Sequence, residues 1–213
     1  MSLIDLINKK SILPSQSEAL PGRKEKIEVP NEHFITGTTM VEPFPSEMKK
    51  AMFGMGCFWG VEKIFWQLNG VFSTMVGYSD GLTPNPTYNE VCTGRTGHNE
   101  VALIVYNPND VSFEELLIHF WEGHNPTQGM RQGNDSGTQY RSGIYCFDKE
   151  QNYLALQSKE SYQVELTKSG MGKITTEIND ASEFYYAEHY HQQYLAKNPD
   201  GYCGIGGTGI TFK

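Results

Sequence analysis

The residue best suited to chemistry in this sequence is Cys57, within the run Gly56-Cys57-Phe58-Trp59-Gly60. Apolar residues at 61, 64, 65 and 68 follow at helical spacing, so Cys57 is predicted to lie where a short strand turns into a helix. Backbone N–H groups and the helix dipole favour a thiolate there. The glycines allow close approach of a ligand, and Phe58 and Trp59 offer an apolar wall. The pattern favours a nucleophilic cysteine that attacks an apolar substrate over the alternative, a buried structural cysteine.

A second cysteine, Cys203, lies in a setting that suits a redox partner. It is found in Gly201-Tyr202-Cys203-Gly204, within a glycine-rich tail that is predicted to be flexible. A resolving cysteine needs such freedom because it must reach a sulfenic acid formed elsewhere and close a disulfide. Cys92 and Cys146 have no comparable setting and are predicted to be inert. Since no C-x-x-C pair exists, a structural zinc site has little support.

Several polar side chains on predicted loops are candidates for the same site. Tyr88 and Tyr140 come from two long loops, Asp135 from the second of these, and Glu100 from the start of a strand. A carboxylic acid and two phenols can supply a proton and hydrogen bonds to a substrate oxygen. Composition alone favours Glu100 as a solvated strand-end residue, and nothing in the pattern brings it to Cys57.

Apolar periodicity predicts the elements that must position these residues. Strands are expected at about 50–55, 71–78, 101–106, 141–147 and 174–178. Helices are expected from Cys57 or just after it to Gly70, from a capping box of Ser112 and Glu115, from an Asp148 cap to about residue 169, and over 184–197. Residues 79–97 and 124–139 are predicted loops. Prolines divide residues 1–48, which are predicted to be an extended arm with at most one short helix.

This order of elements predicts an α+β fold. Two βαβ halves side by side match a ferredoxin-like two-layer sandwich with a split βαβ core. We expect a single domain over 1–213. It would consist of an N-terminal arm over 1–48, an α/β catalytic core over 49–197, and a coil-rich, Gly-rich flexible tail over 198–213.

Composition excludes several classes of function. A net charge of −8 and a pI near 5.2 disfavour nucleic acid or an anionic membrane as the main partner. The first ten residues include an early Asp and no unbroken apolar stretch, so no signal peptide is expected and the location is predicted to be cytoplasmic. The tail contains G-x-G-x-x-G over 204–209, but no helix can follow it, and His189 and His191 lack a nearby third ligand. No bound cofactor or metal is therefore expected.

Four motifs in this order resemble the peptide methionine sulfoxide reductase A family, from about residue 50 to about residue 209. They are Gly56–Gly60, Gly94–Glu100, Gln132–Ser142 and Gly201–Gly204. The arm, with Leu20-Pro-Gly-Arg23, resembles the longer bacterial members.

The resemblance implies a role for each candidate residue. Cys57 attacks the sulfoxide sulfur, and a protonated Glu100 donates to the sulfoxide oxygen. Tyr88 and Tyr140 act as hydrogen-bond donors. Phe58 and Trp59 cradle the methyl group of the substrate, while Asp135 holds the peptide part or orders its loop.

The resemblance also implies how the enzyme is recycled. Cys57 becomes a sulfenic acid, Cys203 captures it as a disulfide, and thioredoxin, itself regenerated with NADPH, reduces that disulfide. The family repairs free and protein-bound methionine S-sulfoxide after oxidative stress. Many bacterial relatives carry a further tail cysteine about eight residues after the first, where this chain has Thr211. A single-step relay is therefore expected.

Two other classes of function stay open on the residues alone. In a cysteine hydrolase or acyltransferase, His98 or His191 would activate Cys57, but Cys203 would have no role. In a non-catalytic methionine-binding module, the aromatic residues would form a pocket and no thiol would be consumed.

Overall fold

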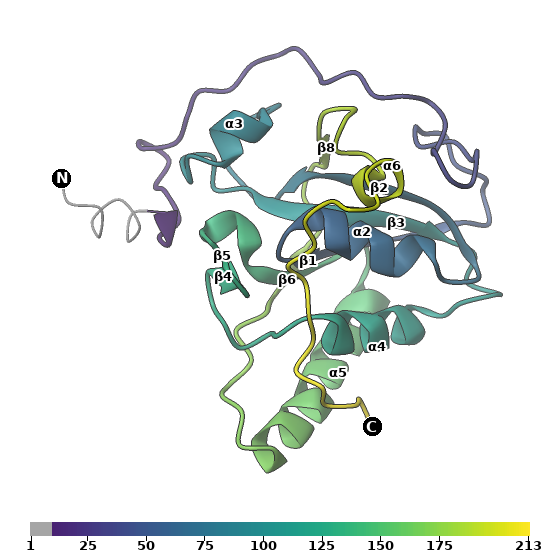
Figure 1. Cartoon of the computed structure of the whole chain (residues 1–213), viewed down its shortest axis with the longest axis vertical. Helices are drawn as coiled ribbons and strands as arrows, with labels where there is room; N and C mark the ends of the chain where they lie inside the picture. The colour runs from purple at the N-terminus through teal and green to yellow at the C-terminus, as the bar shows by residue number, and fades with distance from the viewer. Residues whose placement is uncertain (1–9) are drawn as a thin grey trace.

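A mixed sheet lies at the centre of the protein, for which a computed structural model describes residues 10–213. Over these residues the six-stranded sheet has the order β7-β6-β1-β3-β2-β8 (Figure 1). Its strands are β1 (Lys49–Met55), β2 (Val71–Ser79), β3 (Asn99–Tyr106), β6 (Ser142–Cys146), β7 (Glu177–Asp180) and β8 (Tyr185–Tyr186). Neighbours pair antiparallel except β6 and β7, which are parallel. A separate ribbon joins β4 (Arg131–Gln132) to β5 (Asp135–Ser136).

Helices α2 (Phe58–Trp66), α4 (Phe113–Gly123) and α5 (Lys149–Lys168) pack on one face of this sheet. The alternation in β3 explains this, because Ala102, Ile104 and Tyr106 point into this helical core and the residues between them point away. The predicted cap of α4 is present, with Ser112 and Glu115 bonded reciprocally, and Asp148 caps α5. The predicted α+β class is therefore confirmed.

The arm covers the opposite face of the sheet. Met40, Phe44 and Met48 pack there against Val101, Leu103 and other side chains of the sheet. The described part of the arm, from residue 10, consists mainly of coil and turns, and it also supplies core side chains. In the tail, residues 198–213 contain no helix or strand, yet Ile205, Ile210 and Phe212 pack against the helical core. The segment predicted to be flexible is therefore docked in this structure.

Two predicted segments differ from the structure. No long helix spans 184–197: Tyr185 and Tyr186 pair as β8 on the edge of β2, and only α6 (Tyr194–Lys197) is helical. A left-handed backbone at Gln193, with φ +49°, separates α6 from the preceding turns. The predicted loop 79–97 contains a helix, α3 (Tyr88–Val91), and the last strand is β8 rather than the one near 174–178.

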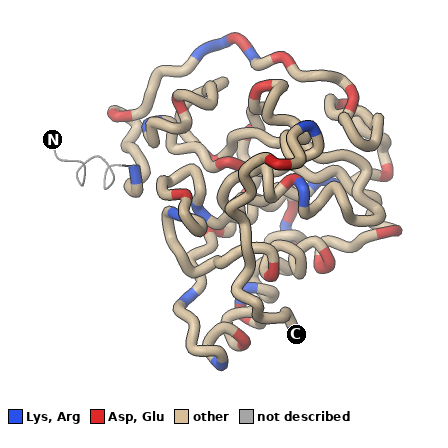
Figure 2. The backbone as a smooth tube through the Cα atoms, viewed as in Figure 1, with Lys and Arg blue, Asp and Glu red and all other residues tan. Residues whose placement is uncertain are grey.

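Acidic and basic positions are interspersed along the chain (Figure 2). Among residues 10–213, no helix combines the length and apolar character that a membrane span requires.

The packing of Phe53 predicts a large loss of stability when this ring is removed. Its centroid lies 5.3 Å from Phe65, 6.0 Å from Phe113 and 5.2 Å from Phe120, and the side chain is fully buried. We expect Phe53→Ala to lower the free energy of unfolding by about 3–5 kcal/mol, measured by urea titration. The exposed Tyr153 serves as the control, and Tyr153→Ala should cost less than about 0.5 kcal/mol. Similar losses for the two variants would contradict this description of the core.

Candidate active site

Cys57 occupies the turn from β1 into α2, as the sequence predicts. It is the N-cap residue of α2, with φ −54° and ψ +117°, and its side chain makes no capping hydrogen bond. Gly56 before it has φ +101°, and a Cβ there would lie 2.6 Å from Cβ of Gln132. The turn therefore requires glycine both for its backbone conformation and for space. This geometry leaves the thiol of Cys57 free at the start of the helix.

The expectation of a resting thiolate at Cys57 is wrong for this structure. Burial raises the pKa of the Cys57 thiol well above its ordinary range, and the nearby Glu100 raises it further. The backbone N–H of Trp59 lowers the pKa, in the direction that a helix N-terminus predicts, but by less than burial raises it. Burial in this structure therefore favours the thiol form of Cys57 over the thiolate.

Glu100 lies beside Cys57 and is not the solvated residue that composition favours. Its side chain is 1% exposed, and Oε2 accepts a hydrogen bond from the backbone N–H of Phe58 at 3.3 Å. Oε1 is buried without a hydrogen-bond partner. Burial raises the pKa of Glu100 to about 8, although the N–H of Phe58 opposes this shift. The carboxyl is mostly protonated at pH 7 and is available as a proton donor.

Tyr88 and Tyr140 lie close to this carboxyl. Tyr88 is the first residue of α3, and Tyr140 ends the short 3-10 helix Thr138–Tyr140. Burial raises the pKa of both phenols, and the nearby Glu100 raises both further. Both are therefore neutral hydrogen-bond donors. The structure thus brings two phenols, from two separate segments, near the carboxyl that lies beside Cys57.

The aromatic wall depends on residues that the sequence prediction missed. The indole of Trp59 stacks on Tyr194, with centroids 3.9 Å apart, and its Nε1–H donates to Nδ1 of His191 at 3.0 Å. His191 also contacts the rings of Phe58 and Tyr88, at centroid distances of 5.2 and 4.5 Å. Because its ring is buried, the pKa of His191 falls to about 4 and the side chain stays neutral. No local pattern reveals this contact, since Trp59 and His191 are 132 residues apart.

The tail brings Cys203 to the first turn of α2. A Cβ on Gly60 would lie 3.1 Å from Sγ of Cys203 and 2.5 Å from Cγ2 of Ile205, so only glycine permits this approach. Both Cys57 and Cys203 are free thiols, and Cys203 is exposed. Asp135, in β5, lies beside the tail, and the hydroxyl of Tyr202 is 3.4 Å from both of its carboxylate oxygens.

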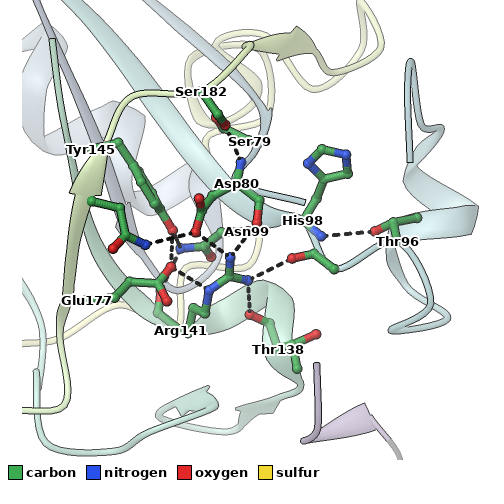
Figure 3. Close-up of polar contacts among 12 residues, drawn as sticks. Ser79, Asp80, Thr96, His98, Asn99, Thr138, Arg141, Tyr145, Glu177 and Ser182 are labelled. Atoms are coloured by element: carbon green, nitrogen blue, oxygen red, sulfur yellow. Dashed lines mark hydrogen bonds and ion pairs between the residues drawn. The ribbon is translucent and has the colours of Figure 1, made fainter. Parts of the chain in front are cut away.

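A buried arginine connects the loop that carries Tyr140 with neighbouring segments of the sheet (Figure 3). Arg141 donates to Glu177 at 2.6 Å, to the carbonyl of Thr138 at 2.9 Å and to the carbonyl of Asp80 at 3.1 Å. Its own carbonyl accepts from Asn99, the residue before Glu100, at 3.0 Å. Arg141 therefore links the loop that carries Tyr140 to the start of β3.

Neither histidine nominated as a base for Cys57 occupies that position. Nε2 of His98 lies 2.7 Å from the carbonyl of Thr83, and His191 accepts from Trp59. Across residues 10–213, no histidine is hydrogen-bonded to Cys57. The Cys–His arrangement of a hydrolase therefore has no geometric support.

The buried Glu100 predicts how stability depends on pH. Since the folded pKa of about 8 exceeds the ordinary value near 4.3, protonation favours the folded state, and this stability is lost as pH rises from about 4.3 to 8. The loss from Glu100 is on the order of 5 kcal/mol at pH 8. Glu100→Gln cannot ionise, so its advantage over the wild type should grow with pH. Urea titrations at pH 5, 7 and 8.5 measure this, with the exposed Glu114→Gln as control. A constant difference across these pH values would contradict it.

Comparisons with known proteins agree with this geometry. The family model for peptide methionine sulfoxide reductase matches residues 49–209. Peptide methionine sulfoxide reductase MsrA 1 of Synechocystis is 60% identical over 210 residues, which cover 99% of this chain and 95% of the relative. The structure of methionine sulfoxide reductase A of Corynebacterium diphtheriae has a TM-score of 0.85 and 46% identity, covering 90% of this chain and 93% of that one.

A third comparison extends the likeness to yeast. The structure of Mxr1 from Saccharomyces cerevisiae in complex with Trx2 has a TM-score of 0.52 and 24% identity, and covers 78% of this chain and 94% of that chain. At this identity the match shows a shared fold. The family model and the two closer matches are sufficient to show that this chain belongs to the peptide methionine sulfoxide reductase family, of the MsrA type.

Proposed function

We propose that this protein reduces free and protein-bound methionine-S-sulfoxide to methionine, with Cys57 as nucleophile. One observation carries the assignment of roles: the buried carboxyl of Glu100 accepts from the N–H of Phe58 and has a second oxygen without a partner. A protonated carboxyl beside a thiol is suited to a substrate whose oxygen must be protonated as its sulfur is attacked.

The first step transfers the substrate oxygen to the enzyme. The sulfur of Cys57 attacks the sulfoxide sulfur and Glu100 donates its proton to the oxygen, while the proton that leaves the Cys57 thiol passes to Glu100 and restores the carboxylic acid. Tyr88 and Tyr140 stabilise that oxygen by hydrogen bonds. Methionine leaves, and the two electrons that reduce it come from Cys57, which becomes a sulfenic acid.

The aromatic residues and Asp135 hold the substrate. Trp59, fixed by His191 and Tyr194, presents a rigid face beside Cys57, and Phe58 closes the apolar side. These two rings suit the methyl group of methionine sulfoxide. Asp135 accepts from the tail or from the peptide part of the substrate.

The second step forms a disulfide, and a reductant then restores both thiols. Cys203 attacks the sulfenic acid of Cys57, a disulfide forms and water leaves. Cys203 is already beside Gly60, so little movement is needed. We extend the pairing of Mxr1 with Trx2 to this chain and propose that thioredoxin, recycled with NADPH, reduces the Cys57–Cys203 disulfide. Since Thr211 stands at the position where the resemblance places a further cysteine, thioredoxin would attack this disulfide directly.

The proposal extends to the fold and location. The inner order β6-β1-β3-β2, with α2 and α4 as the two crossing helices, supports a ferredoxin-like split βαβ core. We propose one domain with an arm over 1–48, a core over 49–197 and a tail over 198–213. A cytoplasmic location stays a prediction.

The central test compares separated sulfoxide epimers in a thioredoxin-coupled NADPH assay. The wild type should reduce the S epimer, and Cys57→Ser should lose at least about 10³-fold in kcat because the nucleophile is gone. Cys146→Ser, a change at a buried thiol of β6, serves as the control and should retain activity. Reduction of the R epimer, or an active Cys57→Ser enzyme, would contradict the proposal.

Thiol counting tests the relay. The reduced protein has four free thiols, and one equivalent of substrate should consume two of them in the wild type. In Cys203→Ser one thiol should be consumed and turnover with thioredoxin should fall sharply, since no intramolecular disulfide can form. If Cys203→Ser turns over normally, Cys203 is not the resolving residue.

A further inference from the structure

The short helix α3 carries Tyr88 and cannot be stable alone. It has four residues, and an isolated helix of that length does not form in water. Its start is held by a capping box: the Glu90 carboxylate accepts from the backbone N–H of Thr87 at 2.8 Å and from its hydroxyl at 3.0 Å. Glu90 therefore contributes to the position of Tyr88, together with Glu188, whose Oε1 accepts from the N–H of Tyr88 at 2.9 Å.

Arg23, from the arm, binds the carboxylate of Glu90. Its guanidinium donates to Oε2 of Glu90 at 2.9 Å and to Oε1 at 2.6 Å, a bidentate ion pair. It also donates to the carbonyl of Asn85 at 2.9 Å. The Arg23 guanidinium holds the pKa of Glu90 below its ordinary value, so the acceptor stays ionised.

Backbone contacts hold the arm in place before α3. Leu20 accepts from the hydroxyl of Thr83 at 2.9 Å, and the N–H of Arg23 donates to Pro84 at 3.1 Å. Gly22 has φ +68°, and a Cβ there would lie 2.2 Å from the carbonyl oxygen of Pro84. Only glycine permits so close an approach.

A further contact lies after α3. The N–H of Leu20 donates to the carbonyl of Arg95 at 3.0 Å. The segment 20–23 therefore bonds the chain on both sides of α3 as well as α3 itself. The arm thus fixes the loop from which Tyr88 projects.

We infer that Arg23 is a positioning residue for the reaction, acting through Glu90 and α3 on the hydroxyl of Tyr88. The inference rests on the proposed function, because it assigns Tyr88 to the sulfoxide oxygen. This inference gives a role to two residues of the Leu20-Pro-Gly-Arg23 motif. Gly22 allows close contact with Pro84, and Arg23 orients α3, which carries Tyr88.

A double-mutant cycle separates this role from a general loss of stability. Arg23→Ala should lower kcat/KM for methionine-S-sulfoxide about tenfold in the wild type, mainly through kcat, because a displaced donor weakens the transition state. In a Tyr88→Phe background the same change should cost less than about twofold, since no hydroxyl is left to position. Equal losses in both backgrounds would overturn the inference, as would an unaffected Arg23→Ala enzyme.

The matched control is another ion pair between the arm and the core. Glu42 accepts from Lys50 at 2.9 Å and does not touch α3. Glu42→Ala should change kcat/KM by less than about twofold. A tenfold loss in this variant would overturn the inference, because any loosening of the arm would then suffice.

Amide hydrogen exchange tests the structural part without activity. The N–H groups of Val91 and Cys92 bond to the carbonyls of Thr87 and Tyr88. Their exchange should accelerate about tenfold or more in Arg23→Ala and stay unchanged in Glu42→Ala. Unchanged exchange in Arg23→Ala would overturn the inference. If the wild type reduces no sulfoxide, the proposed function fails, and the exchange rates alone decide whether Arg23 holds α3.

Discussion

The buried contact between the Glu100 carboxyl and the first N–H of α2 is the constraint on which the site depends. It can form because β1 and β3 are antiparallel neighbours, with Phe53 opposite Ala102. The end of β1, which leads to Cys57, therefore runs beside the start of β3, which carries Glu100. Burial raises the pKa of both Glu100 and Cys57, and it therefore favours the protonated form of each group. The pairing of β1 with β3 thus determines which two groups are buried side by side, and this burial in turn shifts the pKa of each.

The same end of the sheet receives the remaining parts of the site. Met55 pairs with Ser142, so the 3-10 helix that ends at Tyr140 lies where β1 ends. Arg141 follows this 3-10 helix, and its guanidinium donates to backbone carbonyls of two loops, those of Gly97, Thr138 and Asp80. Ion pairs with Asp80 and Glu177 compensate the positive charge of Arg141, whose side chain is only 3% exposed. Without these partners a buried guanidinium would be strongly destabilising.

Local patterns predicted much of this molecule, and long-range contacts account for what they missed. Apolar periodicity located β1, β2, β3 and β6, approximately β7, and the helices α2, α4 and α5, and capping residues marked the starts of α4 and α5. The motif at Cys57 indicated a turn into a helix, as observed. The state of its thiol depends on burial by distant segments, so the expectation of a thiolate failed. Residues 184–197 were predicted as an aromatic-rich helix, but Tyr185 and Tyr186 instead pair with β2 at the edge of the sheet.

Extended segments complete both sides of the site, and each is fixed by a few specific contacts. The tail is anchored after Cys203 by Ile205 against Gly60 and further on by the N–H of Phe212, which donates to Glu122 at 2.7 Å. Before Cys203, the N–H of Gly201 bonds to the carbonyl of Asn198 at the end of α6. Between these anchors Cys203 belongs to no helix or strand, so it can shift toward Cys57 without breaking regular backbone hydrogen bonds. The disulfide proposed between Cys57 and Cys203 would therefore cost little conformational entropy to close, because Cys203 lies against Gly60 in the same first turn of the helix that Cys57 caps.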